Sequence, residues 1–383
     1  MAYLWHDAFW LKNRSNIMRY ECAKGQPINI YGICPFSWKK RGDSSCFTLA
    51  ELSRELVPYV KQMGYTHVNL DRSFLLGDDG YTFIDGLHSA GVGVTVTCSS
   101  DEDHVKFLNW LQEYHVDGII CQGEIKELLP LIKNEFPDVL FFENGISGRA
   151  WTDVALSYMQ KDPIYRKYHH DELISATEQL LCGSALLSVT GADVVNGKRS
   201  LLDKMYGEYN EKFAGLRVFL SHMMTVPSKK LLFMGSEIGQ FSEWDSFGQL
   251  DWFLLGFEKH AQMQKYVSDL NMLYLEESAL WEGSFEWLDS SADMSIISYK
   301  RTDKDGNELF VILNFTPVFR DSYIISTADD RACVEVFSSD DAQYGGSGYR
   351  NHSELMPRDY GEKHGVSVNI PPLTAIILKK IKR

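Results

Sequence analysis

Residues 92–121 read VGVTVTCSSDEDHVKFLNWLQEYHVDGIIC, and this stretch contains one complete unit of the fold that the sequence predicts. The β-branched apolar runs at 92–98 and 116–121 are typical of buried strands. Residues 105–115 between them have the spacing of an amphipathic helix. A strand, a helix and a second strand in this order imply a parallel pair joined by a helical crossover.

The same alternation continues through the first two-thirds of the chain. Further strands are predicted at residues 28–34, 66–70, 139–142, 185–190 and 231–235. Further helices are predicted at residues 49–65, 81–91, 126–136, 209–226 and 258–278. The stretch between residues 142 and 185 is expected to be irregular. About seven or eight strand–helix units favour a (β/α)8 TIM-type barrel over an open doubly wound sheet.

From about Trp281 onwards, short strands separated by turns replace this pattern. They are FEWLDSS, MSIISYKR, ELFVILNFT, DSYIIS, CVEVFSS, GVSVNI and TAIILKKI. Asp305-Gly306 between two of them predicts a hairpin turn. The pattern predicts an antiparallel β-sandwich. The expected organisation is a remnant N-terminal segment (1–26), a barrel (27–280) and a C-terminal all-β sandwich domain (281–383).

The composition argues against several classes of function. The formal net charge of -14, without long runs of Lys or Arg, disfavours a nucleic-acid partner. No segment is long and apolar enough to cross a membrane, and the start lacks a secretory signal pattern. The cysteines are scattered without a CxxC pair, which predicts reduced core residues in a cytoplasmic protein that binds no metal. No cofactor is expected.

Several motifs are specific enough to indicate a family. They are DPIYRKYHHDEL (162–173), VVNGKRSLLDKM (194–205), KFAGLRVFLSHMM (212–224), KKLLFMGSEIGQFSEWD (229–245), LDWFLL (250–255) and YGGSG (344–348). In order and register, the chain resembles bacterial glycogen branching enzyme, a 1,4-α-glucan branching enzyme of the α-amylase superfamily. The resemblance implies a barrel with a C-terminal β-sandwich. It also implies an activity that cuts an α-1,4-glucan, holds it as a covalent glucosyl-enzyme and passes it to a 6-hydroxyl.

The residues that carry this chemistry in the family are largely replaced. In register with the family's fourth strand, VDGIICQG has Ile120 in place of an arginine and Gln122 in place of the nucleophilic aspartate. Glutamine cannot ionise, so it cannot attack the anomeric carbon. The third strand ends with Thr97 where the family has an aspartate. These substitutions predict a barrel without intact catalytic residues.

The seventh strand of the family ends with histidine, aspartate and glutamate, and SVTGADVV has Gly191, Ala192 and Asp193 in their place. At the acid/base position of the fifth strand, the ungapped register gives Asn144, and a slip of one residue gives Glu143. Glu143 is therefore either a surviving acid or a solvated carboxylate at the strand end. Glu124 beyond the fourth strand is an alternative nucleophile only if its loop folds back.

Deletions accompany the substitutions. The loop after the third strand, SSDEDH (99–104), is short, and few residues separate the fifth strand from GRAWTDV. A parallel crossover needs about a dozen residues. The sixth strand or its helix is therefore expected to be missing, shifted or non-parallel, which gives a reduced or distorted barrel. Of the family's N-terminal sugar-binding module, only the tail LWHDAFWLKNR (4–14) is expected to remain.

Three further residues are candidates for substrate binding: His169, His170 and Trp244. The motif that contains the two histidines is interpreted as a loop that ties the sixth strand to its neighbours, with a sugar or partner contact as the alternative. A metal at these histidines is not expected, because no carboxylate triad accompanies them. Trp244 is interpreted as a core or domain-interface residue, and stacking on a glucan is the alternative.

The sequence leaves three hypotheses for function. The first is a non-catalytic homologue of branching enzyme that binds α-glucan or a protein of glycogen metabolism. The second is an α-glucan glycosyltransferase or hydrolase with weak or altered activity that uses Glu143, Asp193 or Glu124. The third is a vestigial protein without a selected role. Self-association as a homodimer is expected, because the deletions uncover apolar surface.

Overall fold

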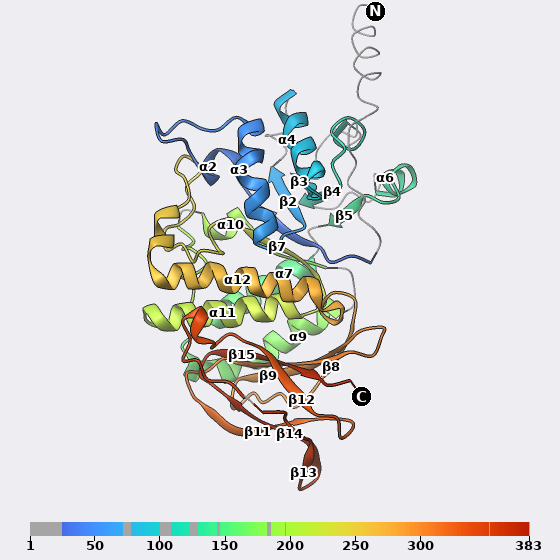
Figure 1. Ribbon diagram of the computed structural model, residues 1–383, viewed down its shortest axis with the longest axis vertical. Coiled ribbons are helices and arrows are strands. Elements are labelled where there is room, and N and C mark those ends of the chain that lie inside the picture. The colour runs from blue at the N-terminus through green and yellow to red at the C-terminus, as the bar shows by residue number, and fades with distance from the viewer. Residues whose placement is uncertain are drawn as a thin grey trace, which may run out of the picture.

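The strands predicted in the first two-thirds of the chain form one sheet in the computed structural model. The structure describes residues 25–71, 78–99, 109–122, 129–143, 146–181, 185–195, 197–351 and 353–382. The strands are β1 (Asn29–Gly32), β2 (His67–Asp71), β3 (Gly93–Ser99), β4 (Gly118–Gln122), β5 (Leu140–Glu143), β6 (Leu186–Val189) and β7 (Lys229–Phe233). All their pairings are parallel, in the order β5-β4-β3-β2-β1-β7-β6. The predicted reduced barrel is confirmed as a parallel half-barrel (Figure 1).

The two faces of this sheet pack differently. One face carries a cluster built from strand residues and the residue just before β1, called the interior cluster here: Ile28, Ile30, Ile120, Phe142, Leu186 and Leu231. On the other face, residues such as Val96 and Cys121 pack with the helices. Neighbours along a strand point to opposite faces. Ile120 therefore points to the interior, whereas Cys121 next to it meets the helices.

Most of the predicted helices are present. α3 (Leu49–Gln62) begins with a capping box, in which Thr48 and Glu51 accept each other's backbone N–H groups, and it buries residues four apart. The others are α4 (Asp78–Ser89), α6 (Leu129–Glu135), α11 (Tyr209–Thr225) and α12 (Glu258–Glu276). The helix predicted at 105–115 lies partly outside the described residues. Two short helices were not predicted: α2 (Pro35–Trp38) and α10 (Gly191–Val194).

The prediction of an irregular stretch between β5 and β6 is wrong. Its described residues form α7 (Ile146–Gln160), α8 (Pro163–Arg166), the 3-10 helix η2 (Lys167–His169) and α9 (His170–Leu181). In α7, Trp151, Ala155 and Tyr158 are buried at helical spacing. Gly148 and β-branched residues weaken the helical signal in its first half. Within residues 146–181 no strand forms, so the sheet ends at β5 on one side and β6 on the other.

Helix α7 lies along the free edge of β6. A Cβ atom added to Gly148 would overlap the carbonyl oxygen of Leu186 in β6, which shows how closely the two backbones approach. Thr152 Oγ1 of α7 lies 3.2 Å from the carbonyl oxygen of Ser188 in β6, to which it donates. An uncovered edge would present unpaired polar groups to solvent. The helix therefore covers the edge that the loss of the sixth strand leaves open.

The C-terminal third forms the predicted antiparallel β-sandwich. One sheet has the order β12-β15-β10-β9-β8 and the other β11-β14-β13. The strands are β8 (Ser284–Trp287), β9 (Ile296–Thr302), β10 (Glu308–Asn314), β11 (Arg320–Ser326), β12 (Cys333–Ser338), β13 (Arg358–Tyr360), β14 (Lys363–Ile370) and β15 (Thr374–Lys380). The hairpin at Gly306 (φ +74°) joins β9 to β10, as predicted.

Buried arginines join the half-barrel to the β-sandwich. Arg301 of β9 donates to the carbonyl oxygens of Thr225 (2.6 Å) in α11 and of Leu280 (3.0 Å). Burial lowers its pKa to about 10.

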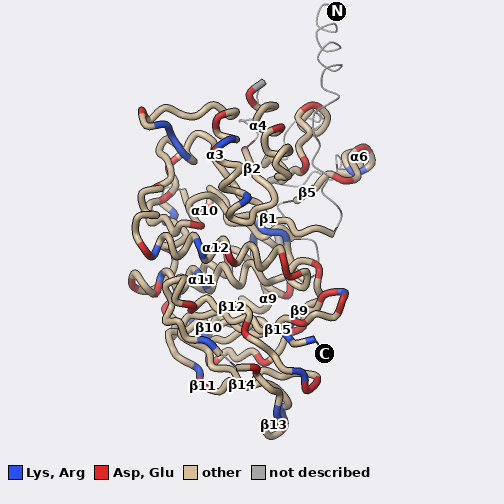
Figure 2. The backbone as a smooth tube through the Cα atoms, in the orientation of Figure 1, with Lys and Arg blue, Asp and Glu red and all other residues tan. Residues whose placement is uncertain are grey.

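In the part of the chain that the structure describes, no helix is long and apolar enough to cross a membrane. Basic and acidic residues are interspersed along the backbone (Figure 2).

Two buried histidines predict that the protein loses stability in weak acid. Burial lowers the pKa of His222 to about 3 and that of His67 to about 4, from an ordinary value of 6.5. Below pH 6.5 these two histidines therefore bind more protons in the unfolded chain than in the folded chain, and their contribution to the free energy of unfolding falls as the pH falls. At pH 5 the loss relative to pH 8 is roughly 2 kcal/mol for each histidine.

Urea unfolding between pH 8 and pH 5 measures this loss. The variant His222→Leu is expected to reduce the pH dependence in this range by roughly 2 kcal/mol, because it removes one of the two groups. A variant with the pH dependence of the wild type would contradict the assignment to His222.

Candidate functional site

The C-terminal ends of the parallel strands meet at one edge of the sheet, where a barrel enzyme places its catalytic residues. The register pairs Thr97 of β3 with Ile120 of β4, two residues before Gln122. It pairs Cys121 of β4 with Glu143 of β5. The structure therefore brings together the site positions that the sequence predicts on these three strands.

Thr97 belongs to a neutral polar cluster between β2 and β3. Asn69 donates through Nδ2 to Thr97 Oγ1 (3.0 Å). Its Oδ1 accepts from the hydroxyl groups of Thr95 (3.0 Å) and Thr97 (3.2 Å). Amides and hydroxyls carry no charge near neutral pH. This cluster satisfies its own hydrogen bonds but supplies no acid, base or nucleophile.

Ile120 fills the position of the family's arginine with apolar contacts. Its side chain is 4% exposed and belongs to the interior cluster, beside Phe142 of β5. A carboxylate at position 122 would therefore lack a cation at position 120. An unpaired carboxylate close to apolar groups has a raised pKa and is a weaker electrostatic partner for a positive transition state.

The register gives a position for Glu143, one of the two candidates for the acid/base. Glu143 is paired with Cys121, which packs against the helices. Phe142, one residue earlier, belongs to the interior cluster. Because positions alternate along a strand, Glu143 occupies a register position of the helix-covered face. Asn144 and Glu124 lie outside the described residues.

Asp193 is committed to two structural contacts. Its Oδ2 accepts hydrogen bonds from the backbone N–H (2.8 Å) and the hydroxyl (2.8 Å) of Thr190, which caps α10. Its Oδ1 lies 2.5 Å from Nη1 of Arg149 in α7. Asp193 is 4% exposed. Burial lowers the pKa of Arg149, but the ion pairs with Asp193 and Asp153 outweigh this effect and raise it.

Aromatic rings close the space next to Gly191. A Cβ atom at this position would lie 2.9 Å from Phe233 and 3.1 Å from Trp244. The two rings pack edge to face with centroids 5.0 Å apart, and Trp244 Nε1 donates to Ser37 Oγ (3.0 Å). Trp244 is therefore held by internal contacts. Ala192 is exposed on α10, and its carbonyl accepts from Lys198 Nζ (2.8 Å).

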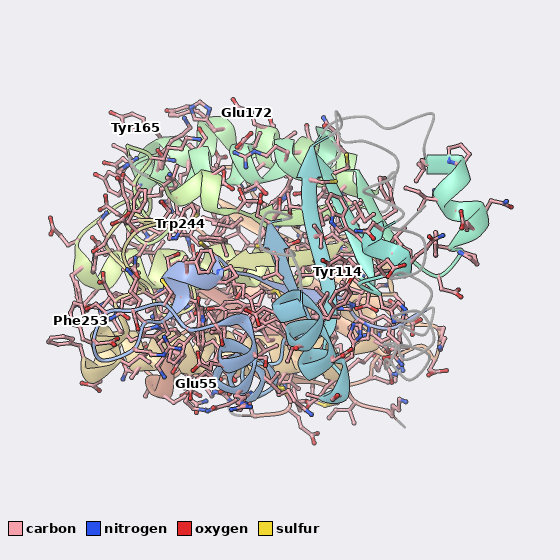
Figure 3. The ribbon with its side chains drawn as sticks, turned by 90° about the horizontal axis from the view of Figure 1, so that it is seen from above. Glu55, Tyr114, Tyr165, Glu172, Trp244 and Phe253 are labelled. Carbon is pink, nitrogen blue, oxygen red and sulfur yellow. The ribbon has the colours of Figure 1, made fainter. Side chains whose placement is uncertain are left out.

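Figure 3 compares the position of Trp244 with that of two exposed aromatic residues. Tyr165 and Phe253 point outwards at the edge of the molecule, whereas Trp244 lies away from that edge in this view and is partly buried. Tyr165 and Phe253 are 56% and 68% exposed. Trp244, the tryptophan that the sequence singled out for sugar stacking, thus has a ring that is used in internal packing.

The histidine motif ties the helices to the β-sandwich, so the predicted tie to a sixth strand is wrong. Arg166 is 1% exposed and donates to the carbonyl oxygens of Phe315 (2.5 Å) in the sandwich and Met159 (2.9 Å) in α7. His170 is fully buried, and its Nε2 lies 3.2 Å from the carbonyl oxygen of Ile296 in β9. With no sixth strand among residues 146–181, the β-sandwich supplies these acceptors.

His169 and His170 do not face a common ligand. His169 is part-exposed and its Nδ1 lies 2.9 Å from Glu172 Oε1, one turn further along the chain. His170 Nδ1 meets the hydroxyl of Tyr158 (3.1 Å). Among the described residues, no group of three or more His, Cys, Asp or Glu side chains is arranged to hold a metal ion.

Sequence reasoning missed one buried carboxylate near the same edge of the sheet. Glu237, in the loop after β7, is fully buried, and its Oε1 accepts from the hydroxyls of Tyr31 (2.6 Å) and Tyr59 (2.8 Å). Its Oε2 has no partner among the described residues. Burial raises the pKa of Glu237. The sequence signal for this residue was a carboxylate shortly after the strand LLFMG (231–235). Because Glu237 is fully buried, a substrate cannot reach its carboxyl group.

The chain matches known proteins in sequence over most of its length. Residues 287–381 match the family model for the alpha amylase C-terminal all-beta domain. The 1,4-alpha-glucan branching enzyme GlgB of Halothermothrix orenii is 31% identical, and the alignment covers 94% of this chain and 77% of that protein. The GlgB of Nitrosomonas eutropha is 30% identical, with 98% of this chain and 68% of that protein covered.

Solved structures show the same fold. The alpha-amylase of Geobacillus thermoleovorans complexed with acarbose is similar with a TM-score of 0.65 at 12% identity, over 93% of this chain and 98% of that one. An Anoxybacillus alpha-amylase is similar with a TM-score of 0.66 at 12% identity, and the match covers 94% of this chain and 99% of that one. At this identity the likeness concerns the architecture alone.

Proposed function

This chain belongs to the 1,4-alpha-glucan branching enzyme family of the α-amylase superfamily, and we propose that it binds α-glucan without transferring glucosyl groups. The observation that carries the loss of transfer is that structural contacts occupy both oxygens of the Asp193 carboxylate. The carboxylate is taken up by the cap of α10 and by Arg149. The activity for which the relatives are named, 1,4-alpha-glucan branching, supplies the substrate class, an α-1,4-linked glucan.

Retaining transfer between glucans requires two carboxyl groups about 5–5.5 Å apart, one as nucleophile and one as acid/base. Gln122 stands at the nucleophile position and cannot ionise. Glu143 occupies a register position of the helix-covered face. Ile120 removes the cation beside the nucleophile. These features support a protein whose fold is retained and whose chemistry is lost.

The purified chain is expected to leave amylose unchanged, without loss of iodine staining and without new reducing ends. Gln122→Asp is expected to stay inactive as well, because members of a catalytic unit contribute non-additively and one restored member returns little. Mass spectrometry after incubation with a fluorinated glucosyl donor tests for a glucosyl adduct on residue 122. Wild-type activity that Glu143→Gln abolishes would instead establish an altered enzyme and overturn the proposal.

A glycogen-metabolism protein as partner, and a homodimer, stay predictions from the sequence. Sedimentation at micromolar concentration distinguishes a dimer from a monomer.

A further inference from the structure

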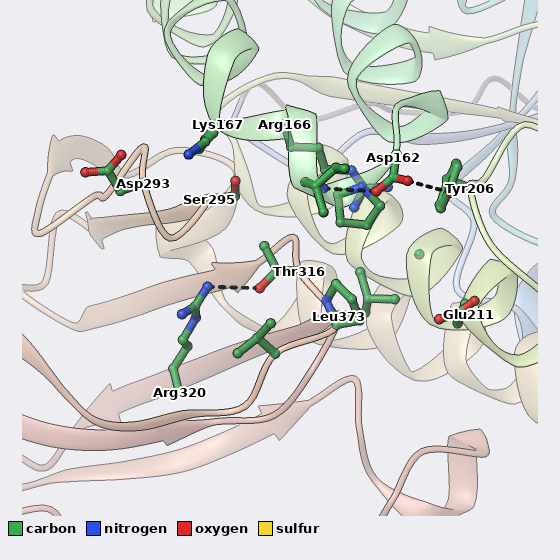
Figure 4. A pocket seen from close by; sticks show the side chains of 15 residues that line it. Asp162, Arg166, Lys167, Tyr206, Glu211, Asp293, Ser295, Thr316, Arg320 and Leu373 are labelled. Carbon is green, nitrogen blue, oxygen red and sulfur yellow. Dashed lines mark hydrogen bonds between the residues drawn. The ribbon is translucent and has the colours of Figure 1, made fainter.

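A cavity of about 410 Å³ lies where the half-barrel meets the β-sandwich. Five stretches of the chain that are distant in sequence line it, and it is called the junction pocket here. They are the turn around α8 (residues 162–167), the start of α11 with the residues before it (206–215), and three stretches of the sandwich (293–295, 316–320 and Leu373) (Figure 4). Its size is in the range of small-molecule sites.

Large apolar side chains line this pocket and are open to solvent. Ile164 of α8 is 64% exposed, Val318 of the sandwich is 47% exposed, and Tyr206 is 43% exposed. Single exposed apolar residues are normal, but several around one concave surface are typical of a binding site. The rigid pyranose ring has apolar C–H faces that such side chains can cover.

Fixed polar groups accompany these apolar residues. Asp162 accepts hydrogen bonds from the backbone N–H of Ile164 (3.1 Å) and from the hydroxyl of Tyr206 (2.7 Å), so the Tyr206 ring is held in place. The hydrogen bond from Tyr206 lowers the pKa of Asp162, which keeps it ionised. Two walls of the junction pocket are thus organised before a ligand enters.

Arg320 supplies a donor without an acceptor. Its Nη2 donates to Thr316 Oγ1 (3.3 Å), as Figure 4 shows, and to the carbonyl of Met294 (3.2 Å). Its Nε is buried and has no acceptor among the described residues. A buried donor without an acceptor costs free energy. This atom is shielded from water, so a ligand in the pocket would meet other atoms of the Arg320 side chain.

The charges around the junction pocket balance. Lys167 and Asp293 stand at one end, and Tyr206 and Glu211 at the other (Figure 4). The lining contains three cationic and three anionic side chains: Arg166, Lys167 and Arg320 against Asp162, Glu211 and Asp293. No net charge therefore favours an anionic or a cationic ligand. A neutral ligand with many hydroxyl groups satisfies both the charged ends and the apolar walls.

We propose that the junction pocket binds a short stretch of α-1,4-glucan. The C–H faces of the sugar lie on Ile164, Val318 and the Tyr206 ring, and its hydroxyls meet Arg320 and the surrounding carboxylates. The proposal rests on the proposed function and adds the place of binding, away from the ends of the barrel strands. Binding would hold α8 and the sandwich together, so glucan should also raise the Tm of the full chain.

Isothermal titration of the full chain with maltoheptaose tests the site, and β-1,4-linked cellohexaose serves as the linkage control. Ile164→Asp is expected to weaken maltoheptaose binding at least tenfold and to remove the rise in Tm. Ile164 is 64% exposed, so an aspartate at this position is expected to leave folding intact, and the Tm without ligand checks this directly. Met356→Asp is the matched control, because Met356 is 50% exposed and does not line the pocket.

The outcomes separate the two proposals. Binding by the wild type that Ile164→Asp weakens, with Met356→Asp unchanged, supports both. Wild-type binding that Ile164→Asp and Val318→Asp leave intact overturns the junction pocket but keeps glucan binding as the function. No binding of maltoheptaose, or equal binding of cellohexaose, overturns both.

Discussion

Gly148→Ala is expected to destabilise the protein by roughly 3 kcal/mol, and Gly148→Val by more. The added Cβ atom would overlap the carbonyl oxygen of Leu186 and lie 3.1 Å from its carbonyl carbon. Both atoms belong to the backbone of β6, so no flexible side chain can move aside. Either α7 must move away from the sheet or β6 must shift against β7.

The midpoint of urea unfolding measures this loss. Gly215→Ala is the matched control, since Gly215 also lies inside a helix, α11, and its Cβ atom would have no neighbour closer than 3.5 Å. This control is expected to be neutral or to stabilise by up to about 1 kcal/mol, because alanine favours a helix over glycine. Equal midpoints for Gly148→Ala and the wild type would show that α7 does not pack closely on β6.

The expected effect follows from what α7 replaces. A closed barrel has no strand edges, whereas this sheet ends at β6. Thr152 donates to the carbonyl of Ser188, and Gly148 allows the helix backbone to reach the strand. Position 148 therefore has to be small for a reason that a full barrel would lack.

Much of the architecture could be predicted from local patterns. β-branched runs located the strands, and capping and apolar spacing located helices such as α3. Helix α7 was missed because Gly148 and the β-branched Thr152 and Val154 lower helix propensity, and packing on β6 overrides that preference. The short connection after β5 predicted that the sixth strand or its helix is missing, shifted or non-parallel, but it did not indicate that helices take this place.

The candidate site could also be predicted only in part. The residue types at positions 122, 120 and 97 could be read from the sequence, and they predicted the loss of ionisable groups. The partner of Asp193 could not, because Arg149 lies 44 residues earlier, in the stretch expected to be irregular. The junction pocket is also beyond local patterns, because five distant stretches of the chain build it.

The second large effect is expected at Asp193. Asp193→Ala should destabilise the protein by roughly 2–4 kcal/mol, because it removes the cap of α10 and leaves Arg149 without its buried partner. Asp193→Asn should cost less, since its amide oxygen can still accept from the Thr190 N–H. Arg149 keeps its other partner, the exposed Asp153 (2.8 Å), which limits the cost.

A double-mutant cycle with Arg149→Met separates the cap from the ion pair. Once Arg149 is absent, Asp193→Ala is expected to cost only about 1 kcal/mol, the usual value of a helix cap. The difference between the two costs is the coupling that the 2.5 Å contact predicts. If Asp193 were a catalytic acid kept at the expense of stability, its removal would leave the unfolding midpoint unchanged or raise it. A lower midpoint with strong coupling to Arg149 therefore means that the carboxylate at this family position now stabilises the fold by joining α10 to α7.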